Sequence, residues 1–172
     1  MAERLPAYFA LIPDDDGRPV STHIELYVAG PARLRAAVEG LDPALLRTRT
    51  APGTWSALEV LGHVADCDQY LADRMKRTIA LDRPLLVGAD TDRYPDALGY
   101  PERDPETQLR LVEATRAQLA PDLARLPDAA WSRTGLHTEV GLFTLRLQLL
   151  YAVKHLDDHT HLIELKRAAL ES

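Results

Sequence analysis

The sequence is poor in cysteine, with Cys67 alone among 172 residues. A single cysteine excludes an internal disulfide bond and any multi-cysteine zinc or iron–sulfur site, so a metal ion would be bound mainly by histidine and carboxylate side chains. The sequence also lacks a basic block: 26 acidic residues outnumber 20 Lys and Arg, and the formal net charge is −6. Such a chain repels nucleic-acid backbones and anionic lipid surfaces. We therefore expect no nucleic-acid or membrane partner and favour a small-molecule substrate or a protein partner.

Long apolar runs are absent as well. The opening stretch MAERLPAYFALIPDDDG has one short apolar run, which Pro6 and Pro13 interrupt and three aspartates close. It is typical neither of a signal peptide nor of a membrane span of about 20 residues, so we expect a cytoplasmic protein. Prolines and a glycine predict that residues 1–20 are irregular. A chain of this length fits one domain, which we predict to cover residues 1–172.

Helical periodicity runs through most of the remaining chain. A first helix is predicted over residues 22–40, where Gly30-Pro31 must kink or split it, because proline has no N–H donor and clashes with the preceding turn. A second helix is predicted after Ser56, which can form a capping box with Glu59. Apolar positions then recur at helical spacing for about six turns.

The periodicity lapses over residues 82–104, DRPLLVGADTDRYPDALGYPERD. A connection of this length is unusual in a compact domain, and such segments often form lids or site walls. Asp104-Pro105 then predicts an N-cap and first turn for a third helix that continues to Leu123, although Pro121 interrupts its last stretch.

The last part of the chain contains a second connection, residues 127–143, and a final helix over about Leu145–Leu170. Within that connection HTEVGLF, residues 137–143, could form a short strand, but it has no obvious partner. We therefore predict an all-α fold, a four-helix bundle with a long connection between the second and third helices.

Three histidines lie close together in KHLDDHTH, residues 154–161. On a helix, His155 and His159 are one turn apart on the same face, beside the apolar stripe, whereas His161 falls on the solvent side. An i, i+4 pair of imidazoles can bind one divalent metal ion, because both rings lean the same way. Two ligands alone do not make a site.

A third ligand should come from another helix and face the core. His63 fits, because it lies on the shoulder of the apolar face of the second helix. His23 and His137 are weaker candidates, near an uncertain helix start and in a connection. Three histidine ligands leave positions open for water or substrate, which is the catalytic pattern for zinc. A single inward histidine is more often a hydrogen-bonded core residue, so the set needs independent support.

That support comes from a resemblance. The stretches GTWSALEVLGHVAD, GLHTEVGLFTLRLQLL and HLDDHTHLIEL resemble blocks of the DinB/YfiT-like metalloenzymes, from about residue 24 to the end. The resemblance implies a four-helix bundle that is often a homodimer and that binds a divalent ion, often zinc or nickel, through His63, His155 and His159. Asp158 departs from the family pattern, which often has a histidine there, and this leaves the residues around the ligands and the substrate chemistry open.

Two enzymatic interpretations follow. In the favoured one, which resembles characterised members of the wider superfamily, the metal activates the sulfur of a thiol such as bacillithiol or mycothiol for S-transfer or isomerisation. In the alternative, metal-activated water hydrolyses an amide or ester with a nearby carboxylate as general base. The first is favoured because no HExxH-type glutamate adjoins the ligands. A non-catalytic stress-response binding protein is a third interpretation.

Residues one helical turn from the proposed ligands are candidate catalytic helpers. Asp66, Tyr151 and Asp158 could orient a ligand ring or transfer a proton, although the two aspartates could equally be surface charges. Cys67 could approach the metal as a thiolate, but a lone buried cysteine more often fills apolar space.

Other residues have a weaker functional interpretation. Arg74 and Arg146 could bind a carboxylate of the thiol or substrate, though helical arginines are usually solvated. Trp55 and Trp131 are expected to pack the bundle ends rather than to stack on substrate. The 82–104 connection is our candidate for the segment that sets substrate choice.

Overall fold

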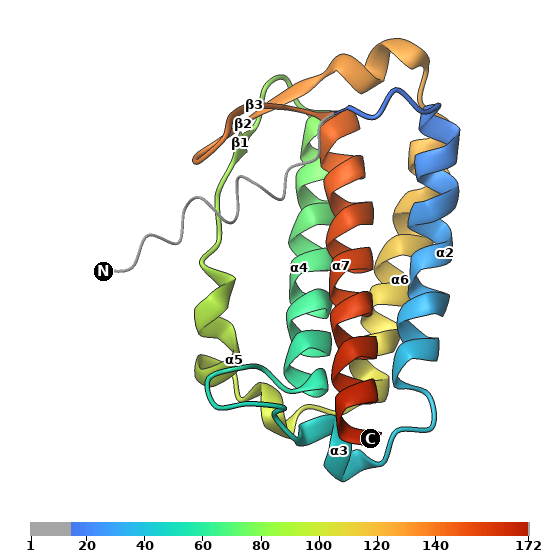
Figure 1. Ribbon diagram of the computed structural model, residues 1–172. Coiled ribbons are helices and arrows are strands. Elements are labelled where there is room, and N and C mark those ends of the chain that lie inside the picture. Colours follow the sequence, from blue (N-terminus) through green and yellow to red (C-terminus); the bar gives the residue numbers. More distant parts are fainter. Residues whose placement is uncertain (1–14, 172) are drawn as a thin grey trace.

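Four long helices form the body of the molecule. The computed structural model describes residues 15–171, and its long helices lie side by side in Figure 1: α2 (Val20–Val38), α4 (Ala57–Ala80), α6 (Pro105–Ala124) and α7 (Leu145–Glu171). Both α2 and α4 pack against α6 and α7, so α2 and α4 occupy opposite corners of the bundle. None of the helices in this described range is long and apolar enough to cross a membrane.

The helix starts follow local capping signals. The Ser56 side chain accepts from the Glu59 N–H and the Glu59 carboxylate accepts from the Ser56 N–H, which confirms the predicted capping box. The Asp104 side chain caps α6 by accepting from the Thr107 N–H at 2.8 Å. Helix α6 continues through Pro121 to Ala124. In the N-terminal segment predicted to be irregular, residues 1–14 lie outside the described residues, and 15–19 precede α2 without helix or strand.

Of the two predicted effects of Gly30-Pro31, a kink or a split, the structure excludes the split, because α2 runs as one helix to Val38. Pro31 cannot donate to the Tyr27 carbonyl, four residues earlier. The Arg116 guanidinium donates to that carbonyl instead, at 3.2 Å. Gly30 leaves the space for it, since a Cβ there would lie 2.9 Å from Arg116 Nη1. A side chain of α6 therefore replaces the hydrogen bond that proline removes from α2.

A small sheet at one end of the bundle corrects the purely helical prediction (Figure 1). The strands β2 (Thr134–His137) and β3 (Gly141–Thr144) form an antiparallel hairpin, and β1 (Leu85–Leu86) pairs in parallel with β2. The candidate strand at 137–143 thus overlaps a hairpin whose turn lies inside it. The residues of β3 within it pair with β2, which directly precedes them in the chain. The third strand, β1, comes from the long connection, too far away in sequence for a local pattern to indicate it.

The connection between α4 and α6 is largely structured. It contains β1 and three short helices: η1 (Thr91–Arg93), α5 (Tyr94–Ala97) and η2 (Tyr100–Glu102). Two further short helices lie in other connections: α3 (Pro43–Arg47) between α2 and α4, and η3 (Asp128–Ser132) between α6 and β2. Both α5 and η2 contact α4. Tyr100 packs on Gly62, where a Cβ would lie 2.9 Å from the Tyr100 ring. The connection is thereby held along one side of α4.

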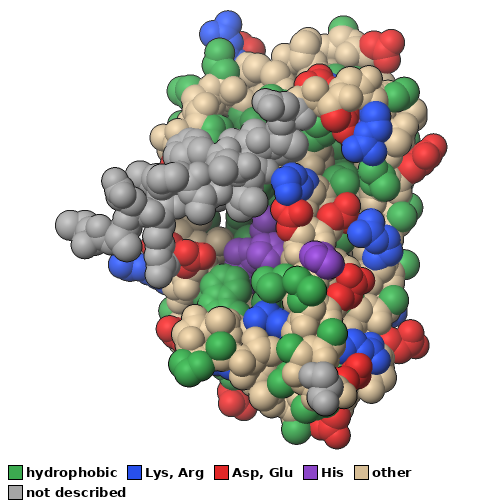
Figure 2. All heavy atoms as spheres, viewed as in Figure 1, with side chains coloured by type: hydrophobic (Ala, Val, Ile, Leu, Met, Phe, Trp, Pro, Cys, Tyr) green, Lys and Arg blue, Asp and Glu red, His purple; other side chains and the backbone are tan. Residues whose placement is uncertain are grey.

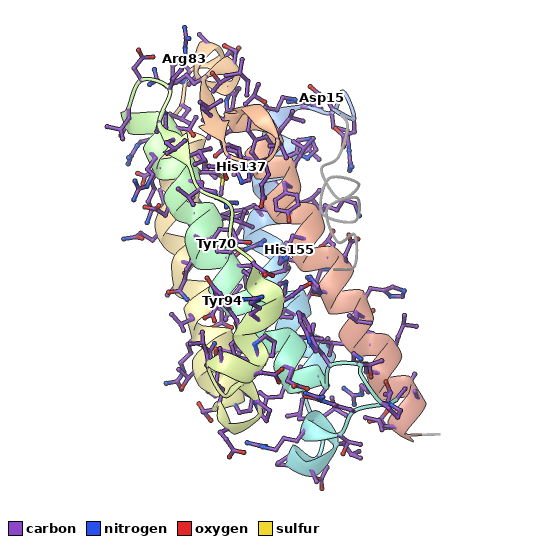
Figure 3. All side chains as sticks on the ribbon, turned by 90° about the vertical axis from the view of Figure 1, so that its left-hand side faces the viewer. Asp15, Tyr70, Arg83, Tyr94, His137 and His155 are labelled. Atoms are coloured by element: carbon purple, nitrogen blue, oxygen red, sulfur yellow. The ribbon has the colours of Figure 1, made fainter. Side chains whose placement is uncertain are left out.

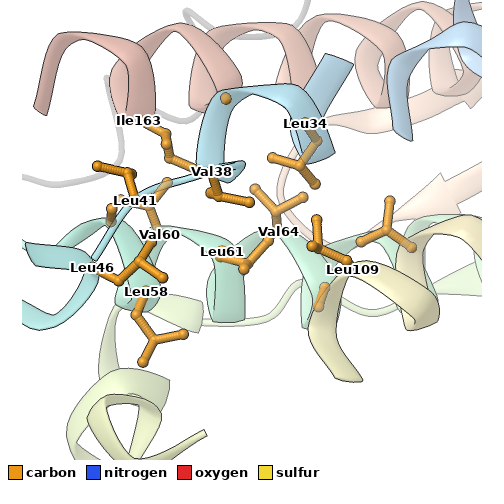
Figure 4. Close-up of a cluster of buried hydrophobic side chains, with 14 of the residues drawn as sticks. Leu34, Val38, Leu41, Leu46, Leu58, Val60, Leu61, Val64, Leu109 and Ile163 are labelled. Carbon is orange, nitrogen blue, oxygen red and sulfur yellow. The ribbon is translucent and has the colours of Figure 1, made fainter. Parts of the chain in front are cut away.

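Two clusters of buried apolar side chains fill the bundle. The first lies toward the α3 end and joins all four long helices (Figure 4): it includes Leu34, Leu58, Leu61, Leu109, Leu156 and Ile163. The second lies toward the sheet and includes Tyr27, Met75, Leu119, Trp131, Phe143 and Leu149. These clusters fix α4 against α7, the pair of helices that carries the candidate ligands.

Candidate metal centre

Three histidine rings converge between α4 and α7. His63 Nε2 lies 3.2 Å from His155 Nε2. The ring of His159 lies 4.5 Å from that of His155 and 4.7 Å from that of His63, measured between centroids. Figure 3 shows His155 midway along the bundle, and Figure 2 shows histidine side chains gathered at the surface of one face. The packing of α4 on α7 thus brings together residues about 90 positions apart.

The three imidazoles are held in their neutral form. Burial and, to a smaller extent, the neighbouring His159 lower the pKa of His63 to about 3. Burial likewise lowers the pKa of His159 to about 4 and that of His155 well below its ordinary value. A neutral imidazole is the form that binds a metal ion, whereas a protonated ring cannot. The pocket therefore presents nitrogen lone pairs at neutral pH.

The donor set fits a divalent ion such as zinc. The two Nε2 atoms at 3.2 Å are close enough for one ion to contact both at the usual zinc–nitrogen distance of roughly 2.0–2.1 Å. His159 Nδ1 is buried and has no hydrogen-bond partner among the described residues. A buried polar atom of this kind is rare unless an ion or water satisfies it. Three neutral nitrogen donors would leave coordination positions open for a substrate.

Cys67 lies one turn after His63 and borders the same site. Its Sγ is 3.5 Å from His63 Nε2, and single donor atoms of His63, Cys67 and His155 all lie within 4.8 Å of one another. Burial raises the pKa of the Cys67 thiol to about 12. The Tyr70 hydroxyl donates to Sγ at 3.3 Å. Without a metal ion the sulfur is therefore a neutral thiol that accepts a hydrogen bond.

Two aromatic residues contact the histidines. The Trp55 ring lies 5.1 Å from the His63 ring, although Trp55 also packs on the first apolar cluster, as expected for a residue at the bundle end. Tyr151, a predicted helper, is buried with its ring 5.8 Å from that of His155. The contact of Trp55 with His63 was not predicted. No helical spacing indicates it, because Trp55 lies before the N-cap of α4.

The two predicted carboxylate helpers bind other side chains. Asp66 accepts from the Tyr100 hydroxyl at 2.5 Å and from Arg103 at 3.0 Å, so it holds the connection against α4. Asp158 is exposed and pairs with Lys154 at 2.5 Å on the surface of α7. Neither carboxylate contacts a histidine ring in the described structure through a hydrogen bond, although the charge of Asp158 raises the pKa of His159.

The remaining candidates lie in structural contacts. Arg146 binds Asp15 at 2.6 Å, and so anchors the start of the described chain on α7 rather than facing the histidines. Arg74 is buried, lies over the Tyr70 ring and donates to the Val87 carbonyl. Trp131 packs in the sheet-end cluster, as expected.

The other three histidines lie apart from the converging rings. His23 is buried at the start of α2, 3.0 Å from Asp16. His137 is buried on β2, against the Phe143 ring, and lies nearer the sheet end than His155 in Figure 3. His161 is exposed, as the helical spacing predicted, and it pairs with Glu164 at 3.4 Å.

A cavity of about 390 Å³ opens beside the histidines along one face of α7. His155 and His159 are part of its lining. The described residues that line the rest are Tyr151, Asp158, His161, Leu162 and Leu165. A molecule in this cavity would reach the two histidines directly.

The sequence matches a family model over most of its length, residues 26–163. The chain belongs to the DinB superfamily. This membership confirms the resemblance drawn from the sequence. A curated superfamily relative from Bacillus subtilis (strain 168), named "Putative metal-dependent hydrolase YfiT", is 27% identical over 139 residues, covering 80% of this chain and 78% of the relative. Another, "Putative metal-dependent hydrolase" from Geobacillus thermodenitrificans (strain NG80-2), is 27% identical over 103 residues, which cover 60% of this chain and 58% of the relative.

Solved structures agree with the DinB-superfamily fold. The structure of YfiT from Bacillus subtilis, described as having "an unusual four-helix bundle topology", superposes with a TM-score of 0.85 at 21% identity, covering 92% of this chain and 93% of that one. A mycothiol-dependent maleylpyruvate isomerase superposes with a TM-score of 0.67 at 16% identity, covering 84% of this chain and 60% of that one. Both likenesses show the fold.

Proposed function

We propose that this DinB-superfamily protein is a divalent-metal-dependent enzyme in which His63, His155 and His159 bind the ion, zinc or nickel. The convergence of three neutral imidazoles from α4 and α7 beside a cavity carries this proposal. The metal-dependent hydrolase names of the curated relatives support it. The bound ion would supply Lewis-acid chemistry, lowering the pKa of a water or thiol that it contacts.

Within this class we favour S-transfer or isomerisation with a low-molecular-weight thiol such as bacillithiol or mycothiol. Hydrolysis with a carboxylate general base would use Asp66 or Asp158. Asp66 is bound by Tyr100 and Arg103, and Asp158, which lines the cavity, is paired with Lys154. A thiol needs no such base once the metal lowers its pKa. The name of the mycothiol-dependent structural neighbour is consistent with this choice.

Hydrolysis of an amide or ester is the second candidate. It is favoured by the names of both curated relatives, the first of which matches along 80% of this chain. The buried histidines bind the ion equally well for either reaction, so the choice depends on the nucleophile.

Metal content tests the site. We expect untagged protein to carry about one metal ion per chain by elemental mass spectrometry, and His155→Ala to lose it, because two imidazoles do not retain the ion through purification. His161→Ala is the matched control: its ring is exposed two positions beyond His159, and this variant should keep the metal. Absence of metal from the unmodified protein as well would contradict the proposal and favour a non-catalytic binding protein.

Turnover separates the two reactions. Metal-loaded protein is given monobromobimane with and without bacillithiol or mycothiol. In S-transfer the thiol sulfur forms a bond to the bimane carbon, bromide leaves, and the thiol proton goes to solvent. We expect the metal-loaded protein to accelerate conjugation of the thiol to bimane, and we expect His155→Ala not to accelerate it. Hydrolysis of p-nitrophenyl acetate at a rate independent of thiol would instead support the hydrolase.

A further inference from the structure

The cavity beside the histidines follows α7. Its lining includes Tyr151 and the proposed ligands His155 and His159. Further along the helix it includes Leu162 and Leu165, whose side chains are 36% and 54% exposed. Leu162 lies two turns after His155 on the same helix face, about 10 Å along the axis at 1.5 Å per residue. A molecule that reaches the histidines can therefore extend along an apolar wall of α7.

The charged groups at the rim of this wall are already paired. Asp158 binds Lys154 at 2.5 Å, and His161 lies 3.4 Å from Glu164. Both pairs join residues three or four positions apart on α7, so they lie along the helix surface rather than pointing to a bound molecule. Apart from the histidines and Tyr151, the described lining thus offers apolar surface and paired charges. A charged group placed there would lose hydration without gaining a partner.

From these contacts we infer that the substrate which reacts at the histidines carries an uncharged apolar group, an alkyl chain or aryl ring, that lies along α7 against Leu162 and Leu165. The inference rests on the proposed metal site and adds the chemical class of the group next to the reacting atom. A volume of about 390 Å³ is within the usual range for small-molecule sites, and it suits a medium-length chain or single ring. When a ligand covers this exposed pair of leucines, apolar surface is removed from water, and this favours binding.

Straight-chain hydroxamic acids test the inference independently of turnover, because the hydroxamate head binds a metal ion and only the alkyl tail varies. Zinc-loaded protein is titrated by calorimetry with the acids from aceto- to octanohydroxamic acid. We expect affinity to rise about twofold to fourfold per methylene, the gain from burying a CH₂ group, and to level off when the tail passes Leu165.

A double variant locates the tail. In Leu162→Asn/Leu165→Asn the gain per methylene should largely disappear, while acetohydroxamic acid binds as before. The matched control is Leu142→Asn, since Leu142 is 65% exposed on β3 outside the cavity lining, and it should keep the full chain-length dependence.

The outcomes distinguish the two levels of proposal. Binding of acetohydroxamic acid without any gain from longer tails would overturn the apolar-group inference and leave the metal site intact. A chain-length gain that survives in the double variant would overturn it too, because the tail would then lie elsewhere. If no hydroxamate binds and His155→Ala does not change the metal content, both the proposed function and this inference are wrong.

Discussion

At the scale of single residues, the question is which side chains hold the ion. His63, Cys67 and His155 have donor atoms within 4.8 Å of one another, while the His159 ring adjoins both of the other imidazoles. The two candidates for a third ligand differ in chemistry. His159 is neutral at neutral pH, because burial lowers its pKa to about 4, whereas Cys67 must lose a proton whose pKa burial raises to about 12. A bound ion would itself lower the pKa of a thiol, so this difference alone does not decide the ligand, and the three-histidine interpretation predicts His159.

We therefore expect Cys67→Ala to keep its metal and His159→Ala to lose it. The absorption spectrum of the cobalt-substituted protein provides a second readout: it should show no sulfur-to-cobalt charge-transfer band in the near ultraviolet, since no thiolate contacts the ion. A strong band that vanishes in Cys67→Ala would identify the cysteine as a ligand.

At the scale of elements, the sheet is the part of the structure that depends most on distant pairing. Its inner face includes His137, which is only 2% exposed. The Glu139 N–H donates to His137 Nδ1 at 3.2 Å, a contact that requires an unprotonated nitrogen there. Burial and the charge of Arg74 lower the pKa of His137 to about 4. Folding therefore opposes protonation of this ring.

This shift predicts a pH dependence of stability. Because the folded-state pKa lies below the unfolded value of about 6.5, the stabilisation is complete above pH 6.5 and is lost as the pH falls toward 4. We expect the free energy of unfolding of the wild type to decrease more steeply from pH 7 to 5 than that of His137→Gln, by at most about 1.4 kcal/mol per pH unit. Urea unfolding of both proteins across this range measures the slopes, and equal slopes would refute the assignment.

At the scale of the whole molecule, one buried side chain joins all four long helices. Arg116 of α6 pairs with Asp68 of α4 at 2.7 Å, and both side chains are at most 3% exposed. It also donates to the carbonyls of Tyr27 on α2 and Ala152 on α7. The guanidinium has five donors in a fixed planar arrangement, which lysine cannot reproduce. Arg116 thus fixes the helices on which the candidate ligands are carried.

Loss of Arg116 should be costly. We expect Arg116→Met to reduce the free energy of unfolding by about 3–5 kcal/mol, because it leaves Asp68 buried without its partner. The double variant Arg116→Met/Asp68→Leu should recover a large part of this loss, since neither charge then remains buried. Denaturant unfolding of the three proteins measures both effects. A loss below about 1 kcal/mol in the single variant would show that the pair contributes little.

Comparison of the predicted and observed helices shows what short-range sequence patterns determine. The capping box of Ser56 and Glu59, the Asp104 cap and the spacing of His155 and His159 all depend on residues within four positions of one another. Helical geometry fixes such contacts wherever the helix goes. The sequence alone therefore predicted the four long helices and the face that carries the histidine pair.

Contacts between distant residues were decided only by the tertiary structure. Three such contacts join segments more than 30 positions apart. They are the pairing of β1 with β2, the hydrogen bond of Asp66 with Tyr100, and the hydrogen bond by which Arg116 replaces the donor missing at Pro31. No periodic pattern encodes them, because they depend on how the helices pack. His63 shows both levels: its inward face followed from local spacing, and its position 3.2 Å from His155 follows from the packing of α4 against α7.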